Sequence, residues 1–239
     1  MKNIWNQRQR IGVFLCLFLI AVSLSLPNIL NGIPDGHDLI YHLSRIMGTV
    51  DLLNHGVKHP IMLPGFYYNY GYPVPLFYPT GLLNSVVIMV RSGMSLVNAY
   101  TLFIFLIHLL TAGIFYITTH RFTSNKAIRL VVTFVYCFAP YRMYTDFYTR
   151  QALGEFIAFA FIPLAFYSLL EILRYDARKW PLLTLSMISL AYSHTLSTMA
   201  IIAYFVVFVI FNAKRLLKEK QRLLRSEEHT SELQSLSHL

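Results

Sequence analysis

Long apolar runs alternate with short polar segments along this chain. The runs at 11–30, 96–118, 152–173 and 195–211 approach or exceed the ~18–20 residues of helix that cross a bilayer, and shorter apolar runs occupy 128–141 and 181–192. Most charged side chains lie between the runs rather than within them. The pattern predicts an all-α, multi-pass transmembrane helical bundle of about six spans.

The apolar segment 81–90 has only ten residues, which form about 15 Å of helix. Because this is half of the hydrocarbon thickness, we expect an interfacial or re-entrant helix there. The segment from about 31 to 95 is then one loop outside the membrane, built from juxtamembrane helices. The run at 181–192 is also short for a crossing, and we expect it to form a hairpin with 195–211.

The distribution of basic residues sets the orientation. Up to residue 224, the topology above places fourteen lysines and arginines on the side of the N-terminus and five on the opposite side. Cytoplasmic loops carry the excess of these residues, so we expect the N-terminus in the cytoplasm. If 81–90 crossed the membrane, the basic loops would move outside.

Composition narrows the class of protein further. Hydrophobic residues make up 56% of the chain and charged residues 13%, against about 25% charged in ordinary soluble domains. The chain has 20 Lys and Arg but 11 Asp and Glu, an excess that would indicate nucleic-acid binding in a soluble protein. Membrane orientation explains it here, so the lipid bilayer, and not nucleic acid, is the expected partner.

The densest group of ionisable side chains follows the first apolar run. Asp35, His37, Asp38, His42 and Arg45 lie within eleven residues of one another. Proline and glycine at 34 and 36 predict a turn, and a helix is expected from His37 onward. Asp38, His42 and Arg45 are spaced i, i+4 and i+7, so they share one helix face.

Two further polar clusters fall on the same side of the predicted membrane. The turn at 141–155 contains Arg142, Arg150 and Glu155, and the tip of the proposed hairpin contains His194. Polar groups at membrane depth usually mark a pathway or a site. Arginine offers a planar fork to phosphate oxygens and aspartate can take a proton from a hydroxyl. The clusters therefore predict acid–base chemistry on a substrate that carries phosphate.

Plainer interpretations stand beside these. Asp35 would simply cap the helix, with Asp38 completing a capping box, and His42 would be a surface residue of the loop. His37 and His42 are five residues apart, a spacing that does not favour a shared metal on a helix.

The other two clusters also have structural interpretations. Arg150 and Glu155 would form a structural ion pair. Arg142 would be an interfacial anchor, and His194 would cap or break the hairpin.

The order of these features resembles the N-terminal half of the GT-C glycosyltransferases, and within that superfamily the YfhO-type bacterial membrane proteins. The motifs that carry the resemblance are DLIYHLSRI at 38–46, YGYP at 70–73, RQALGE at 150–155 and SHTL at 193–196, with FYP at 77–79 leading into GLL at 81–83. Some proteins of this kind bear the label "6-pyruvoyl-tetrahydropterin synthase-related", but no zinc-ligand cluster here supports pterin chemistry.

The resemblance implies a GT-C-like fold in a bacterial cytoplasmic membrane. It implies transfer of a sugar from a polyprenyl-phosphate donor to a cell-envelope acceptor on the outer face. Asp38 would be the general base and Asp35 a secondary acid. The substrate and its phosphate would be bound by a set of basic and polar side chains: His37, His42, Arg45, Arg142, Arg150, Glu155 and His194.

Relatives carry an acidic pair where this chain has His37 and Asp38, so the need for a divalent metal stays open. Two other functions remain as alternatives: a carrier or flippase for a lipid-linked substrate, and a non-catalytic membrane subunit of envelope assembly. The carrier or flippase would use the arginines of the polar clusters to bind a phosphate without catalysing a reaction.

The composition changes abruptly near the C-terminus. Residues 225–235 read RSEEHTSELQS, which resembles the conceptual translation of a short-read sequencing adapter. We expect 225–239 to be an artefactual tail and 1–224 to be the N-terminal part of a longer GT-C-like transmembrane domain.

Overall fold

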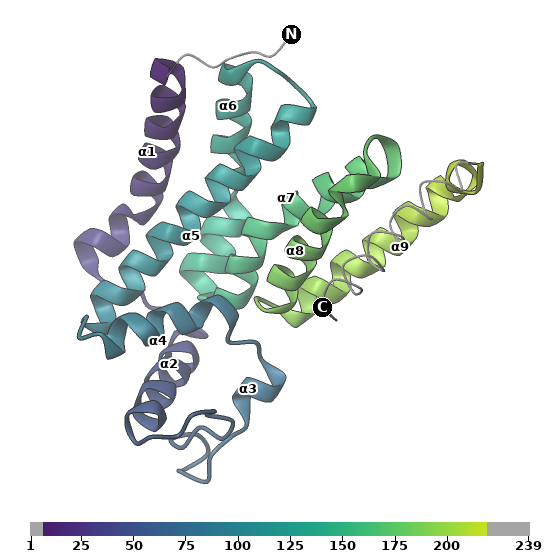
Figure 1. The fold of residues 1–239 in the computed structure, drawn as a ribbon. Helices are drawn as coiled ribbons and strands as arrows, with labels where there is room; N and C mark the ends of the chain where they lie inside the picture. Colours follow the sequence, from purple (N-terminus) through teal and green to yellow (C-terminus); the bar gives the residue numbers. More distant parts are fainter. Residues whose placement is uncertain (1–6, 219–239) are drawn as a thin grey trace, which may run out of the picture.

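The computed structural model describes residues 7–218, and the regular elements in that range are all helices (Figure 1). The longer helices are α1 (Gln7–Asn31), α2 (Leu39–Asn54), α4 (Asn84–Arg91), α5 (Leu96–Thr118), α6 (Lys126–Cys137), α7 (Leu153–Arg174), α8 (Trp180–Ala191) and α9 (Thr195–Lys218). Short elements are α3 (Val74–Phe77), the 3₁₀ turns η1 (Gly81–Leu83), η2 (Thr119–Arg121) and η4 (Ala177–Lys179), and a π-helix η3 (Tyr141–Arg150). The expectations for 225–239, and for a domain reaching 224, lie outside the described residues.

Four helical segments are long and apolar enough to cross a membrane: Gln7–Asn31, Leu96–Arg121, Leu153–Arg174 and Thr195–Ala213. The prediction of an all-α, multi-pass protein is confirmed to that extent. α6 and α8 have 12 residues each, about 18 Å of helix. α6 ends at Cys137, and Pro140, which follows, has no N–H to donate to a preceding carbonyl. The count of six spans therefore stays a prediction.

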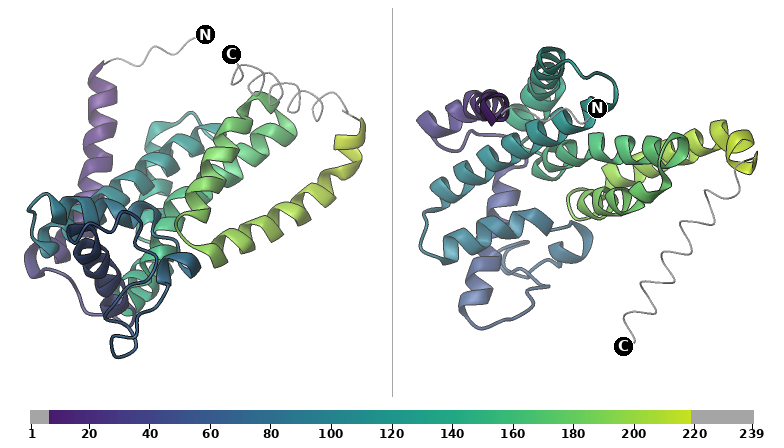
Figure 2. Two further views of the ribbon diagram at one scale, coloured as in Figure 1. Left: turned by 60° about the horizontal axis from the view of Figure 1, so that its bottom comes forward. Right: turned by 45° about the horizontal axis from the view of Figure 1, so that its top comes forward.

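α5 is the central helix of the bundle. It contacts α1, α4, α6 and α7, while α7 in turn contacts α8 and α9. The bounds of α5 agree with the predicted run at 96–118, and Ser95 begins the helix by accepting a hydrogen bond from the amide of Asn98 at 3.3 Å. The main contacts of α9 in the described part of the chain are with α7 and α8, and Figure 2 shows α9 leaving the bundle from the α8–α9 turn.

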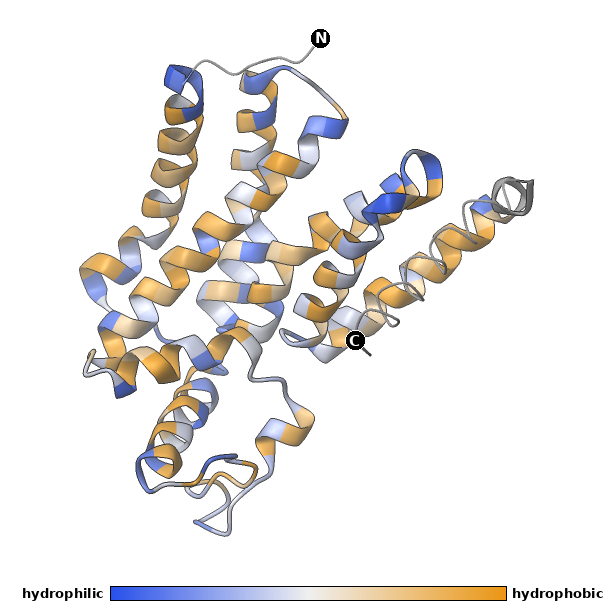
Figure 3. Cartoon of the chain, in the orientation of Figure 1, coloured by the Kyte–Doolittle hydropathy of each residue, from blue (hydrophilic) through white to orange (hydrophobic). Residues whose placement is uncertain are grey.

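Polar residues gather at the two ends of the bundle (Figure 3). One end carries the N-terminal end of α1, the α5–α6 turn and the α7–α8 turn. The loop with α2 and α3 lies at the other end, where α4 runs across the base of α5 (Figure 1). The loop with α2 and α3 therefore lies at the opposite end from the N-terminal end of α1, as predicted, while the orientation of these ends in a membrane stays a prediction. The short helix predicted at 81–90 is also present, as η1 and α4.

Candidate functional site

Tyr78, in the loop after α3, brings the polar segments together. Its ring centroid lies 5.6 Å from that of His42 and 5.9 Å from that of His194. The guanidinium carbon of Arg45 lies 4.4 Å from the same centroid. A Cβ atom added to Gly154 would be 2.4 Å from the Tyr78 hydroxyl. α2, the start of α7 and the start of α9 therefore meet around one ring, which we call the Tyr78 cluster.

The shared face of α2 is buried rather than open to solvent. His42 and Arg45 are 1% and 2% exposed. Arg45 Nη2 donates to the carbonyl oxygens of Tyr78 (3.2 Å) and Pro79 (2.8 Å), and Nη1 lies 3.2 Å from His42 Nδ1. Burial, the charge of Arg45 and the neighbourhood of His194 lower the pKa of His42 to about 3. His42 is thus a neutral acceptor for Arg45, and its interpretation as a surface residue is wrong.

The two aspartates do not cap α2. Asp38 is the N-cap residue, yet its side chain makes no capping hydrogen bond, and Oδ1 of the exposed Asp35 accepts from the amide of Gly36 at 2.9 Å. Asp38 is half-buried near Tyr41 and Tyr78. Burial raises the pKa of Tyr78 to about 12, with Arg45 opposing and the charge of Asp38 adding to the rise. Asp38 thus faces the tyrosines with its carboxylate oxygens uncommitted to the helix.

Backbone hydrogen bonds hold the start of α2 against the end of the π-helix. The amide of His37 donates to the carbonyl of Thr149 (3.2 Å), and the amide of Asp38 donates to that of Arg150 (2.8 Å). A side chain at Gly36 would collide with Gln151, whose Cγ would be 2.2 Å from the added Cβ. These contacts fix Asp38 beside Arg150, although 112 positions separate them.

Gln151 connects the end of the π-helix to α5 of the bundle. It is fully buried, has a left-handed backbone (φ 55°) and accepts a hydrogen bond from the Tyr100 hydroxyl of α5 at 2.6 Å. A left-handed non-glycine residue costs free energy and tends to occur where a site demands it. Sequence reasoning missed Gln151 and Tyr100, because neither belongs to a charged motif.

A carboxyl pair surrounds Arg150. Arg150 Nη1 lies 2.9 Å from Glu155 Oε2, 3.7 Å from Asp146 Oδ1 and 3.4 Å from the Tyr141 hydroxyl, and that hydroxyl donates to Glu155 Oε1 at 2.8 Å. The interpretation of Arg150 and Glu155 as an ion pair is therefore confirmed. Asp146 is fully buried; burial and the charge of Glu155 raise its pKa to about 8, against Arg150 and Arg142.

Asp146 is the charged residue that the sequence interpretation passed over. Its signal was its spacing of four residues from Arg150, within a segment rich in aromatic residues. Both residues lie in the ten-residue π-helix η3, and π-helical turns frequently occur at functional sites.

His194 belongs to the site and also begins α9. Its Nδ1 lies 2.8 Å from the Ser197 hydroxyl and accepts from the Ser197 amide at 3.4 Å, which is a helix cap. Burial lowers its pKa, Glu155 opposes the shift and Arg150 adds to it. The capping interpretation is confirmed, and the same residue connects the Tyr78 cluster with the carboxyl pair.

Arg142 is not part of this arrangement. It is 1% exposed, and its guanidinium donates to the carbonyl of Cys137 (2.9 Å) and lies 3.3 Å from both His108 Nδ1 and Thr111 Oγ1 inside the bundle. The interpretation as an interfacial anchor is wrong, because the side chain is buried among helices. The structure does not bring Arg142 to the Tyr78 cluster, and we leave it out of the proposed site.

The interior of the Tyr78 cluster is closed. A cavity of about 10 Å³ lies between His42, Arg45, Tyr78 and Gly154, which has room for about one water. Beside the cluster, a cleft of about 260 Å³ opens between α3 and the α8–α9 turn, lined by Phe77, Thr80, Tyr192 and neighbouring residues. A substrate would therefore contact the rim of the cluster, where Asp38 and Arg150 are partly exposed.

Clusters of metal-ligating side chains were sought among the described residues. No group of three or more His, Cys, Asp or Glu side chains in that part is placed to hold a metal ion. The chain was also compared with protein-family models, with curated protein sequences and with solved structures, and none of them matches it. The geometry of the site is therefore the basis for assigning a function.

Proposed function

We propose that this membrane protein is a glycosyltransferase of the GT-C kind. It would move a sugar from a polyprenyl-phosphate donor to a hydroxyl of a cell-envelope acceptor, on the outer face of a bacterial cytoplasmic membrane. The observation that carries the proposal is the convergence of three polar segments around Tyr78. They meet at the end of the bundle opposite the basic turns (Figure 3).

Asp38 has the properties of a general base. Its carboxylate is partly exposed and does not cap α2, and the backbone bond from its amide to Arg150 fixes its position. In the proposed step Asp38 takes the proton of the acceptor hydroxyl while that oxygen bonds to the anomeric carbon. The bond from this carbon to the phosphate oxygen breaks, the configuration inverts and the phosphate leaves with the electron pair.

Arg150 would stabilise the departing phosphate. Its side chain is 38% exposed, and its three contacts described above all use Nη1. Nε and Nη2 are therefore left for phosphate oxygens, whose charge grows as the bond breaks. His37, exposed on the preceding turn, and His194 would add donors. His42 and Arg45 would act by positioning Tyr78 rather than by touching the substrate.

The substitution Asp38→Asn tests the proposal. The full chain, reconstituted in vesicles, would be assayed with polyprenyl-phosphate mannose and polyprenyl-phosphate glucose and a membrane extract as acceptor. We expect loss of transfer by at least 100-fold, the lower range for removal of a general base, with unchanged insertion. Asp51→Asn, on an exposed face of the same helix, is the control. Full activity of Asp38→Asn would exclude its role, and absence of transfer in the wild type would overturn the proposed function.

A further inference from the structure

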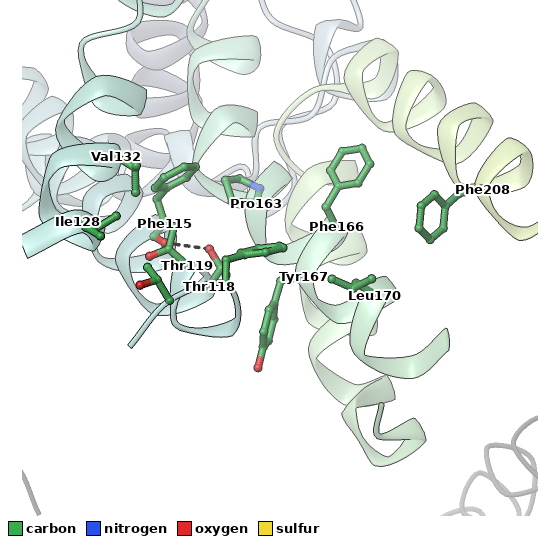
Figure 4. Close-up of a pocket in the computed structure, with 12 residues that line it drawn as sticks. Phe115, Thr118, Thr119, Ile128, Val132, Pro163, Phe166, Tyr167, Leu170 and Phe208 are labelled. Atoms are coloured by element: carbon green, nitrogen blue, oxygen red, sulfur yellow. Dashed lines mark hydrogen bonds between the residues drawn. The ribbon is translucent and has the colours of Figure 1, made fainter. Parts of the chain in front are cut away.

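A large apolar groove lies at the end of the bundle away from the Tyr78 cluster. Its volume is about 670 Å³, and it is lined by the end of α5 with η2, the first half of α6, the second half of α7 and one residue of α9. Figure 4 shows Ile128 and Val132 on one side and Phe208 on the other. Nothing in the proposed transfer reaction uses this groove.

One wall of the groove includes a proline of α7. Pro163 lines it and lies within the helix, where it cannot donate to the carbonyl of Phe159. The hydroxyl of Tyr136 donates to that carbonyl instead, at 2.7 Å. Proline inside a helix leaves a carbonyl of the preceding turn without its usual amide donor, and here a bond from α6 satisfies that carbonyl.

The lining of the groove is predominantly apolar. The Thr118 hydroxyl donates to the carbonyl of Phe115 at 2.9 Å (Figure 4). The Thr119 hydroxyl donates to the carbonyl of Tyr116 at 2.8 Å. With these hydroxyls turned to the backbone, and the Thr123 hydroxyl accepting from the amide of Asn125 at 3.2 Å, the lining is mostly carbon apart from the Tyr167 hydroxyl. A cavity of this kind offers few partners to ordered water. Because the lining helices α5, α7 and α9 are long and apolar enough to cross a membrane, we take the medium around the groove to be hydrocarbon. An alkyl chain is the ligand that these walls suit.

An arginine without an ion-pair partner among the described residues lies beside one wall of the groove. Arg174 is exposed, and its guanidinium carbon lies 5.8 Å from the ring centroid of Phe208, which lines the groove. It donates to the amide oxygen of Asn212 at 3.4 Å, and the ion pairs found among the described residues do not include it. Arg121, by contrast, is neutralised by Glu171 at 3.3 Å.

We propose that the groove binds one acyl chain of an anionic phospholipid, and that Arg174 binds the phosphate of its headgroup. An apolar groove beside an exposed arginine fits an amphiphile with a negative head. Basic pockets between transmembrane helices bind anionic lipids in this way. The site is separate from the Tyr78 cluster, so it neither requires nor supports the proposed transferase activity.

Photo-labelling of the full chain in nanodiscs tests the chain-binding part. The discs contain phosphatidylcholine with a trace of phosphatidylglycerol that carries a diazirine on one acyl chain, and labelled peptides are mapped by mass spectrometry. The variant Val132→Trp fills the groove. Val131→Trp, on the adjacent and more exposed residue of α6 (61% against 37%), is the matched control outside the lining. Both positions are too exposed for tryptophan to disrupt the core.

The variant Arg174→Gln tests headgroup binding. Its control is Arg178→Gln, in the η4 turn that follows α7. We expect the wild type to concentrate label on residues 163–170 and 208, and Val132→Trp to reduce that label several-fold while Val131→Trp leaves it intact. Arg174→Gln should lower the preference for phosphatidylglycerol over phosphatidylcholine about fivefold, the effect of one basic residue at a membrane surface.

Other outcomes would overturn the inference. Label spread evenly around the bundle, or equal in the two tryptophan variants, would mean ordinary annular lipid. Absence of label in the groove would mean that protein fills it. Displacement of the probe by polyprenyl phosphate, but not by phosphatidylglycerol, would assign the groove to a different lipid.

Discussion

Gly154 is the position at which the convergence of the three segments can be tested most directly. It lies in the first turn of α7, against the Tyr78 hydroxyl and the carbonyl of Ser193. A Cβ atom there would be 2.4 Å from the first and 2.9 Å from the second, whereas ordinary contacts begin at 3.4 Å. In Gly154→Ala, Tyr78 and the α8–α9 turn must both move away from α7, the former by about 1 Å.

The cost follows from two opposing effects. Overpacking of this kind costs about 1–3 kcal/mol, and alanine in place of helical glycine returns about 0.5–1 kcal/mol. Gly113 in α5 provides the control, because a Cβ atom there meets nothing within 4 Å. Gly113→Ala should therefore stabilise the protein. Because the gain from replacing glycine by alanine is common to both, the two variants should differ by the overpacking cost alone, about 1–3 kcal/mol in the free energy of unfolding.

Thermal unfolding of the detergent-solubilised chain measures this difference. For a chain of this length, 1 kcal/mol corresponds to about 2–4 °C in Tm, so Gly154→Ala should melt roughly 2–12 °C below Gly113→Ala. Adding Tyr78→Phe removes the nearer clashing atom and should recover part of the loss, a coupling that a double-mutant cycle detects. If Gly154→Ala and Gly113→Ala have the same Tm, Tyr78 does not contact α7 and the Tyr78 cluster does not exist.

Three further predictions concern buried charges. Asp146 has its pKa raised from 3.8 to about 8. Between these values the folded chain keeps a proton that the unfolded chain loses. The unfolding free energy should therefore fall as pH rises, by at most about 1.4 kcal/mol per pH unit; Asp146→Asn should flatten this slope, and an unchanged slope in urea titrations would contradict the assignment. Arg45→Gln should cost about 1.5–3 kcal/mol, because the carbonyls of Tyr78 and Pro79 lose a charged donor; a melting temperature equal to that of the wild type would refute it. Arg142→Gln should lower the Tm and leave the transfer activity of the folded protein unchanged. If Arg142 bound the phosphate of the substrate, the same substitution would instead lower the activity and leave the Tm unchanged.

The helices were predictable because their cause is local. The apolar run at 96–118 has the length and composition of a span whatever surrounds it, and α5 occupies that range. Ser95 begins this helix from within the same segment. The C-terminal end of α6 was harder to predict from the sequence. The apolar run continues to 141, but α6 ends at Cys137, and after Pro140 the chain forms a π-helix.

The roles of individual charges depended on what packs over them. Three arginines in similar polar stretches have three different environments: Arg45 lies on a tyrosine ring, Arg142 inside the bundle and Arg150 between two carboxyl groups. The sequence contains the spacing of these residues but not their burial, and burial sets both the hydrogen-bond partners and the pKa of a charged group.

The sequence by itself determined that the chain is helical and suited to a membrane, and which segments carry its polar chemistry. Hydrocarbon solvent imposes these features on each segment separately, so they can be read without tertiary contacts. Only the tertiary structure decided that Asp38 lies beside Arg150 and that Tyr78 joins α2, α7 and α9. Such contacts between distant segments depend on how the helices pack, on close approaches at glycines and on the direction of each turn, which no local pattern encodes.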